Sequence, residues 1–183
     1  MENIIKKAEE FALSETKKYG SPPKRFLNTS NNKGEKLTKD LNADTDVVKK
    51  GIYLLVIKNK KTRKIKVGSL GQLNFDSGFF VYAGSAQNNL EKRVKRHKSK
   101  SKKLHWHIDY ILDKMNITSV FKFKSKYECT LAKQIKLLSN SFVKGFGCSD
   151  CGCESHLFYF KKSPTSLLKK KESQLSQILK QKN

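Results

Sequence analysis

The sequence lacks any long hydrophobic run. No apolar stretch reaches the roughly 18 residues that a membrane-spanning helix requires. The N-terminal residues 1–10 contain neither a long apolar stretch nor a cleavage site, so no signal peptide is predicted. We therefore expect a cytoplasmic protein without membrane contact. Hydrophobic residues make up only 37% of the chain, which favours one modest core with polar arms over two full domains.

Acidic residues are scarce. The chain has 16 Asp and Glu against 39 Lys and Arg, which gives a formal net charge of +23 at pH 7. Most of the excess lies within residues 51–160, and residues 92–103 contain no acid at all. A field of this sign attracts polyanions and speeds their association. Because the run also lacks the apolar face of an interfacial membrane anchor, nucleic acid is the predicted partner. The protein is therefore expected to associate with the nucleoid. The cations predicted to contact nucleic acid are Lys92, Lys95, Arg96, Lys98, Lys100, Lys102 and Lys103.

Cysteines are also few, and in a reducing cytoplasm the four are expected to be free or metal-bound. A Cys-x2-Cys-x-Cys-x2-His pattern is formed by Cys148, Cys151, Cys153 and His156. Soft ligands this close together make a candidate zinc site, to which His105 or His107 could add a ligand. The alternative is a glycine-rich loop with unpaired thiols, whose Asp150 and His156 line a nucleic-acid site. Cys129 is interpreted as a core residue.

Short apolar runs alternate with amphipathic segments in the middle of the chain. Strands are predicted at 52–57, 65–67, 79–83, 120–123 and 157–160, and helices at 88–98, 106–114 and 127–139. This order predicts an α+β fold over residues 51–161, with a small central antiparallel or mixed sheet flanked by helices. Residues 1–50 are predicted to be a helical extension and residues 162–183 a basic C-terminal helix.

Several short motifs follow one another within this segment. Gly51-Ile52-Tyr53 begins the first strand, and Tyr82-Ala83-Gly84 ends a later one. A helix then opens with Leu90-x-x-Arg93, and a later helix begins with Glu128. In this order the motifs resemble the GIY-YIG nuclease superfamily over roughly residues 51–140.

A closer resemblance is to a little-characterised, archaeal-type branch of that superfamily, a domain of unknown function. It is carried by residues 78–86, 104–110 and 149–158. Since that branch has no assigned function, the catalytic expectation comes from the wider superfamily.

The superfamily resemblance implies a metal-dependent endonuclease. Glu128 would hold Mg²⁺ or Mn²⁺, because one carboxylate suits an ion that keeps most of its waters. Arg93 would bind phosphate through its planar, permanently charged fork. Tyr53 would act as the base and Tyr82 as a supporting hydrogen-bonder, with His97 able to share either role. A tyrosine base requires its pKa to fall in the cationic surroundings.

The sequence departs from compact superfamily members in one respect. Tyr53 and Tyr82 lie 29 residues apart, whereas compact members place the two triplets much closer. Residues 58–78 are therefore predicted to form an inserted hairpin that leaves the two strands paired. The superfamily's late asparagine has no clear counterpart, and Asn140 is a candidate by distance only.

His105, His107 and Asp109 are further candidates for the lining of the site. For His107 and Asp109 the alternative is a buried, hydrogen-bonded pair.

Three functions are compatible with these features. The favoured one is an endonuclease acting on DNA, in repair or recombination, and DNA is preferred to RNA as the substrate. No RNA-stacking signature appears, and the sequence does not itself decide the sugar. The alternative is a non-catalytic nucleic-acid-binding module, which has no physical reason to retain Tyr53, Arg93 and Glu128 together. An enzyme acting on a small phosphorylated substrate is disfavoured, because the basic run exceeds what one phosphate needs.

Overall fold

The computed structural model describes residues 50–181. The helical extension predicted for residues 1–50 lies outside the described residues, apart from Lys50. Within residues 50–181, no helix is long and apolar enough to cross a membrane.

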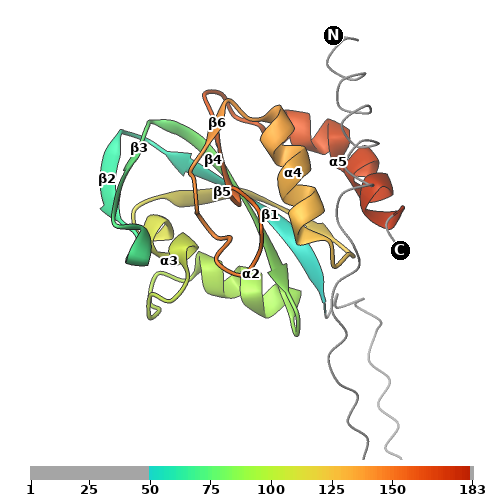
Figure 1. The fold of residues 1–183 in the computed structure, drawn as a ribbon, viewed down its shortest axis with the longest axis horizontal. Helices are drawn as coiled ribbons and strands as arrows, with labels where there is room; N and C mark the ends of the chain where they lie inside the picture. Colours follow the sequence, from blue (N-terminus) through green and yellow to red (C-terminus); the bar gives the residue numbers. More distant parts are fainter. Residues whose placement is uncertain (1–49, 182–183) are drawn as a thin grey trace, which may run out of the picture. The chain divides into compact units, whose positions relative to one another are not determined.

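A five-stranded sheet forms the centre of the described region (Figure 1). Its strands are, in spatial order, β5 (Asn116–Phe123), β1 (Gly51–Asn59), β4 (Gly78–Ala86), β7 (Leu157–Phe160) and β6 (Ser141–Phe142). Every neighbouring pair is antiparallel. The predicted α+β fold with a small central sheet is confirmed, and the sheet is antiparallel throughout.

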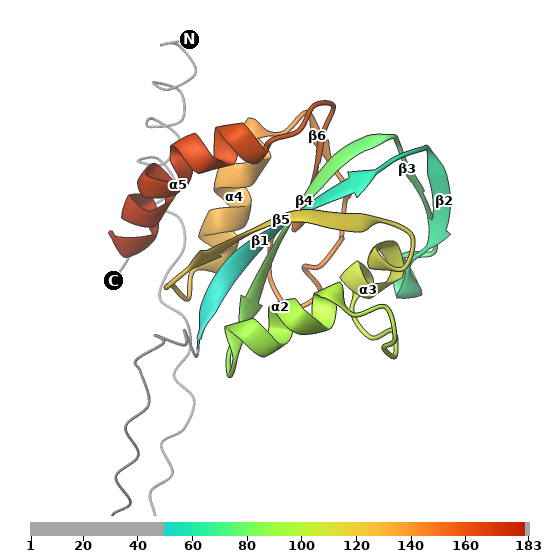
Figure 2. The ribbon, with the colours of Figure 1, turned by 180° about the vertical axis from the view of Figure 1, so that it is seen from behind.

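Helices cover both faces of this sheet, as the opposite views of Figures 1 and 2 show. The helices are α2 (Leu90–Lys98), α3 (His107–Leu112), α4 (Glu128–Leu138) and α5 (Thr165–Lys180). On β1, Tyr53, Leu55 and Ile57 join the core of α2 and α3, while the alternate residues join the core of α4 and α5. Successive strand residues point to opposite faces. Because β1 is buried on both faces, its sequence is an unbroken apolar run over residues 52–57.

The insertion between the two tyrosine motifs is a hairpin, as predicted. It contains β2 (Arg63–Lys66), the short 3-10 helix η2 (Gly68–Leu70) and β3 (Gln72–Phe75), and β2 pairs with β3 in a separate two-stranded sheet. β1 and β4 still pair along their whole length, from Gly51 with Ala86 to Asn59 with Gly78. The long spacing between the motifs therefore does not disturb the pairing of the strands that carry them.

The C-terminal helix α5 belongs to the same core as the sheet. Leu168, Leu175 and Leu179 are buried together with β1 and α4 residues. The backbone carbonyl of Pro164 accepts the N–H of Leu168 at 2.8 Å, which begins the helix where the Ser-Pro pair predicts.

Candidate active site and metal centre

Tyr53 and Tyr82 lie on the same face of the sheet, over Gly84. Tyr53 on β1 is paired directly with Gly84 on β4, and the two tyrosine ring centroids are 6.4 Å apart. A Cβ atom at Gly84 would lie 2.6 Å from the Cζ and Oη atoms of Tyr53 and 2.8 Å from Cε1 of Tyr82. Glycine is needed in the Tyr82-Ala83-Gly84 motif because the Tyr53 ring occupies the space of a side chain.

The next member of the site is His97, which α2 turns toward the sheet. The side chain of Asn89 accepts the N–H of Lys92 at 2.8 Å and thereby starts α2. Val94 and His97 then lie on the buried side of the helix. The His97 Nε2 atom is 2.7 Å from the Tyr53 hydroxyl, so α2 and β1 are joined by a buried hydrogen bond.

His97 is electrically neutral in this position. Burial lowers its pKa to about 3, an effect opposed by Asp109 and assisted by the cations Lys102, Arg93 and Arg96. Among the described residues, its Nδ1 is a buried atom without a hydrogen-bond partner. His97 is therefore held as a neutral imidazole that can accept a proton only at a cost.

Burial also raises the pKa of both tyrosines. For Tyr53 and Tyr82 this effect exceeds the opposing influence of the Arg93 charge. The lowered pKa that a tyrosine base requires is therefore not met in the free protein, because desolvation outweighs the charge of Arg93. Both hydroxyls are therefore protonated at neutral pH, and that of Tyr53 forms the hydrogen bond with His97.

Arg93 is oriented by Trp106. The Arg93 guanidinium lies 4.1 Å from the centroid of the Trp106 ring, and that of Arg96 lies 4.3 Å from it. Stacking on an indole restricts the orientation of a guanidinium and stabilises its charge. The sequence analysis identified Arg93 as a site residue but not Trp106. The feature that could have identified Trp106 is its place as an aromatic residue directly before α3.

Asp109 is structural. Its side chain is fully buried, makes two hydrogen bonds to Arg96 at 2.8 and 3.0 Å, and accepts the backbone N–H groups of His105 and Trp106. Burial raises its pKa, but these hydrogen bonds outweigh burial and lower it. Asp109 thus has the buried, hydrogen-bonded role that the sequence left open, with Arg96 as its partner.

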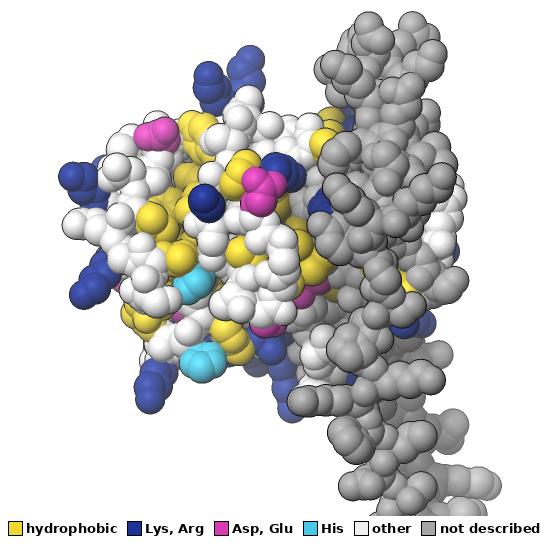
Figure 3. All heavy atoms as spheres, viewed as in Figure 1, with side chains coloured by type: hydrophobic (Ala, Val, Ile, Leu, Met, Phe, Trp, Pro, Cys, Tyr) yellow, Lys and Arg dark blue, Asp and Glu magenta, His cyan; other side chains and the backbone are white. Residues whose placement is uncertain are grey.

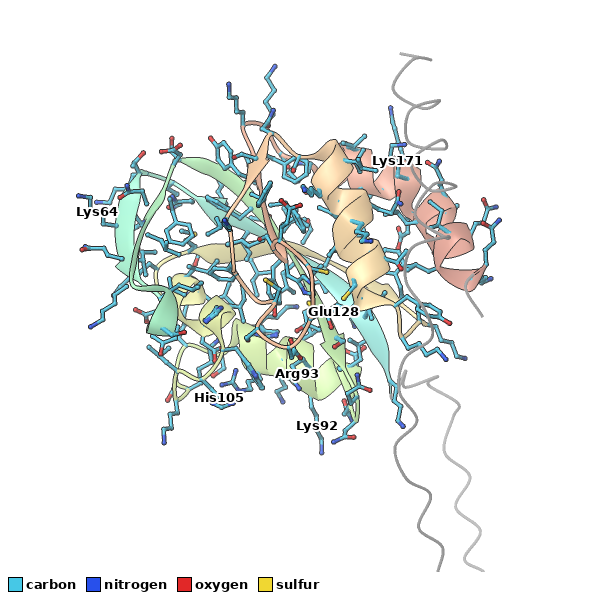
Figure 4. The ribbon with its side chains drawn as sticks, in the orientation of Figure 1. Lys64, Lys92, Arg93, His105, Glu128 and Lys171 are labelled. Carbon is cyan, nitrogen blue, oxygen red and sulfur yellow. The ribbon has the colours of Figure 1, made fainter. Side chains whose placement is uncertain are left out.

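The two neighbouring histidines have different positions. His107 Nδ1 accepts the backbone N–H of Gly147 at 3.1 Å, so His107 ties α3 to the glycine- and cysteine-rich loop. His105 is exposed, as Figure 4 shows, and its ring lies 5.1 Å from the Trp106 ring.

The basic run 92–103 divides into inward and outward cations. Arg96, Lys100 and Lys102 donate to backbone carbonyls within the chain and tie α2 to the following loop and to α3. The outward set is exposed and consists of Lys92, Lys95, Lys98 and Lys103. In Figure 3 most Lys and Arg side chains on the visible face of the described residues stand around its margin, with hydrophobic and His side chains in its middle.

Glu128 begins α4 and faces the same region as Arg93. Figure 4 shows both side chains in one part of the molecule, and both charges act on the Tyr53 hydroxyl. The Oε1 atom of Glu128 accepts a hydrogen bond from His156 Nδ1 at 2.9 Å. The Glu128 side chain is 23% exposed, whereas that of His156 is 2% exposed. Asn140, by contrast, accepts the N–H of Lys161 at the β6–β7 end of the sheet.

Beside Glu128 lies a cluster that could hold a metal ion. Its ligand atoms, all within 4.8 Å of one another, come from Cys129, Cys151, Cys153 and His156. The His156 Nε2 atom is 3.5 Å from the Cys151 sulfur. Hydrogen bonds with Cys153 and His156 lower the pKa of Cys129 to about 4, so the cluster favours a thiolate. Three soft thiols and an imidazole are the donor set of a closed transition-metal site.

The cluster corrects the predicted ligand set in one position. Cys151, Cys153 and His156 belong to it as predicted, but Cys129 takes the place of Cys148. Cys148 is buried, and its carbonyl accepts the N–H of Cys151 in the turn of the loop. Cys129 was wrongly interpreted as core. The sequence feature that could have identified Cys129 is its position next to Glu128. The glycine- and cysteine-rich loop is one predicted lining of the site that contains Glu128, so a thiol beside Glu128 could meet the thiols of that loop.

The neutral His97 should make stability depend on pH. Its folded pKa of about 3 lies below the ordinary value of 6.5. Below pH 6.5 the His97 imidazole is protonated in the unfolded chain but stays neutral in the folded chain. The free energy of unfolding therefore falls as pH drops from 6.5 toward 3. We expect wild type to lose roughly 2–3 kcal/mol more than His97→Gln between pH 7 and pH 4.5. Urea unfolding at both pH values measures this, and equal losses in the two proteins would contradict it.

One known family matches this chain. A family model described as "Domain of unknown function DUF123" matches residues 52–178, from β1 through most of α5. The matched segment contains all the residues of the site described above. No curated protein and no solved structure matches the chain. Because the match covers more than half of the 183 residues, the chain belongs to the family of the domain of unknown function DUF123.

Proposed function

We propose that this protein is a metal-dependent endonuclease of the GIY-YIG type that hydrolyses phosphodiester bonds in DNA, in repair or recombination. The observation that carries the proposal is the convergence of His97, Arg93 and Glu128 around Tyr53: His97 contacts the Tyr53 hydroxyl, and the charges of Arg93 and Glu128 both act on it. These are the groups that phosphodiester hydrolysis requires for water orientation, charge neutralisation and metal binding.

Arg93 would bind the scissile phosphate. Its guanidinium keeps its charge at every physiological pH, and its planar fork matches two phosphate oxygens. The Trp106 ring beneath it, at 4.1 Å, holds the fork ready before substrate arrives. Preorganisation of this kind lowers the cost of stabilising charge in the transition state.

Tyr53 and His97 would accept the proton of the attacking water. Because the Tyr53 hydroxyl is protonated, it orients the water as a hydrogen-bonding group and not as a phenolate. The water proton passes to Tyr53 Oη as the phenolic proton passes to His97 Nε2, 2.7 Å away. A bound phosphodiester brings negative charge, which favours protonation of His97. Tyr82 supports this pair from the neighbouring strand.

Glu128 would hold Mg²⁺ or Mn²⁺. A carboxylate offers about four lone-pair sites, so the hydrogen bond from His156 to Oε1 leaves room for an ion. One partly exposed carboxylate suits a hard ion that retains several waters. When bound, the ion would supply charge neutralisation at the phosphoryl and leaving oxygens.

The thiol-rich cluster would hold Zn²⁺. Four protein ligands leave no open coordination position, which favours a structural ion over a catalytic one. Metal analysis of the purified chain should give one zinc ion per molecule. Protein that folds and holds no transition metal would overturn this assignment.

The basic run favours a polynucleotide as the substrate, with the protein acting in the cytoplasm at the nucleoid. Lys92 points outward beside Arg93 (Figure 4), and the other three lysines of the outward set, Lys95, Lys98 and Lys103, follow it. Each phosphate contact adds to the salt dependence of binding. We expect Lys92→Ala to weaken DNA binding and to reduce the slope of log K against log salt by about one. The matched control is Lys171→Ala on α5, which should leave both unchanged.

A non-catalytic nucleic-acid-binding module is the second candidate. The observation in its favour is that burial raises the pKa of both tyrosines and lowers that of His97, so the free protein has no strong base in the site.

A cleavage assay separates the two candidates. Single-stranded, duplex and branched DNA, and RNA, are incubated with the chain in Mg²⁺ or Mn²⁺. Metal-dependent cleavage of DNA supports the endonuclease. Salt-sensitive binding without cleavage of any of these substrates would overturn it in favour of the module.

A further inference from the structure

We infer that His156 is a positioning residue that joins the two metal sites: its Nε2 binds the metal of the thiol cluster, and its Nδ1–H fixes Glu128. The role assigned to Glu128 rests on the proposed function, whereas the link between His156 and Glu128 rests on the geometry alone.

The two ring nitrogens of His156 face different groups. Nε2 lies 3.5 Å from the sulfur of Cys151, on the side of the cluster. Nδ1 lies 2.9 Å from Oε1 of Glu128, on the other side of the ring. Only Nε2 is therefore available to the metal. A metal on Nε2 requires the proton on Nδ1, which makes Nδ1 a donor and the carboxylate its acceptor.

Burial makes this link rigid. The His156 side chain is 2% exposed, and its backbone is held by hydrogen bonds to both sides, from its N–H to Phe146 and from Ala83 to its carbonyl. Ala83 is the middle residue of the Tyr82-Ala83-Gly84 motif. The same residue thus bonds to the strand that carries the tyrosine motif and to the carboxylate of α4.

Cys129 adds a second connection between the two sites. It follows Glu128 in the first turn of α4 and supplies a thiol to the cluster. A bound metal would hold the N-terminus of α4 through Cys129 and the carboxylate of Glu128 through His156. Metal ligands whose outer partners are carboxylates are held in one orientation, and loss of the partner typically lowers metal affinity about 10- to 100-fold.

The alternative interpretation is that Glu128 is an ordinary acidic residue in the first turn of a helix, where the helix dipole stabilises its negative charge. That interpretation predicts no effect of Glu128 on the thiol cluster. Glu154 provides the comparison, because it is an exposed acid on the same loop, paired with Lys136 outside the cluster.

The test measures zinc affinity by competition with a chelator in the 183-residue chain. Glu128→Ala should lower zinc affinity about 10- to 100-fold, and Glu154→Ala should leave it unchanged. His156→Cys keeps four ligands but removes the Nδ1 donor. In that background, Glu128→Ala should have no further effect on zinc affinity. An unchanged zinc affinity in Glu128→Ala, or an equal loss in the His156→Cys background, would overturn the link.

Manganese binding tests the other end of the link. With zinc bound at one equivalent and circular dichroism unchanged, His156→Cys should bind Mn²⁺ several-fold more weakly than wild type, measured by electron paramagnetic resonance. Equal Mn²⁺ affinities would overturn the positioning role. If the zinc and manganese results hold but no nucleic acid is cleaved, the proposed function fails and the link stands. If nucleic acid is cleaved but Glu128→Ala has the zinc affinity of wild type, only the link between His156 and Glu128 fails.

Discussion

Arg93→Ala should reduce DNA cleavage about 100- to 1000-fold, the range observed when one preorganised charge-stabilising group is removed. The guanidinium is stacked on Trp106 at 4.1 Å, so its charge and its orientation are both fixed before binding. Arg93→Lys separates the two contributions, since lysine keeps the charge but loses the planar fork and the stack. We expect Arg93→Lys to recover substrate binding but only a small part of the rate. Single-turnover cleavage with saturating protein measures the rate apart from binding.

Glu128→Ala should cause a loss of the same size, because it removes the only carboxylate assigned to the hydrolytic metal. Glu172→Ala on α5 is the matched acid control and Lys171→Ala the matched cation control, and both should cleave at the wild-type rate. Cleavage that survives both Arg93→Ala and Glu128→Ala would overturn the site. Thermal unfolding of each variant shows whether a loss of rate has a loss of folded protein as its cause.

Gly84→Ala should damage both stability and activity. The added Cβ would lie 2.6 Å from Tyr53 Cζ and Oη, closer than carbon and oxygen atoms can pack. The Tyr53 ring must then shift from its place over Gly84, which changes the geometry of its hydrogen bond with His97 Nε2. Overpacking of this kind costs about 1–3 kcal/mol, and we expect cleavage to fall further than this loss of stability explains.

Urea unfolding and cleavage of the same preparations measure both effects. Gly152→Ala is the matched control, because a Cβ at Gly152 meets nothing within 4 Å. A Gly84→Ala protein with wild-type stability and rate would show that the close approach of Tyr53 to Gly84 is not required.

The thiol cluster changes the interpretation of the glycine- and cysteine-rich loop. Its thiols lie beside the start of α4, and the N–H of Gly147 donates to His107 on α3. The ring of Phe146 meets that of Tyr82 edge-on, with the centroids 6.3 Å apart. The loop therefore contacts elements on both faces of the sheet. This explains why the same segment supported two interpretations from sequence, a metal site and a lining of the hydrolytic site.

The sequence alone determined most of the elements and their order, although β6, a strand of two residues, was not predicted. The apolar run 52–57, the amphipathic periodicity of 127–139 and the Ser-Pro start of the last helix are local signals of burial, and each element formed where it was predicted. The pairing of β1 with β4 across the hairpin was also predictable, because two buried strands on either side of a polar insertion have no other apolar partner as close in the chain.

Only the tertiary structure decided which side chains meet. Cys129 reaches the cluster from α4, and Glu128 meets His156 across 28 residues of chain. Sequence periodicity does not encode such contacts, because they depend on the path of the loop that leads to β7 and on the position of α4. The raised pKa of both tyrosines also depends on the tertiary structure. Charge can be counted along a sequence, but the depth at which a hydroxyl is buried is a property of the packed sheet and the helices above it.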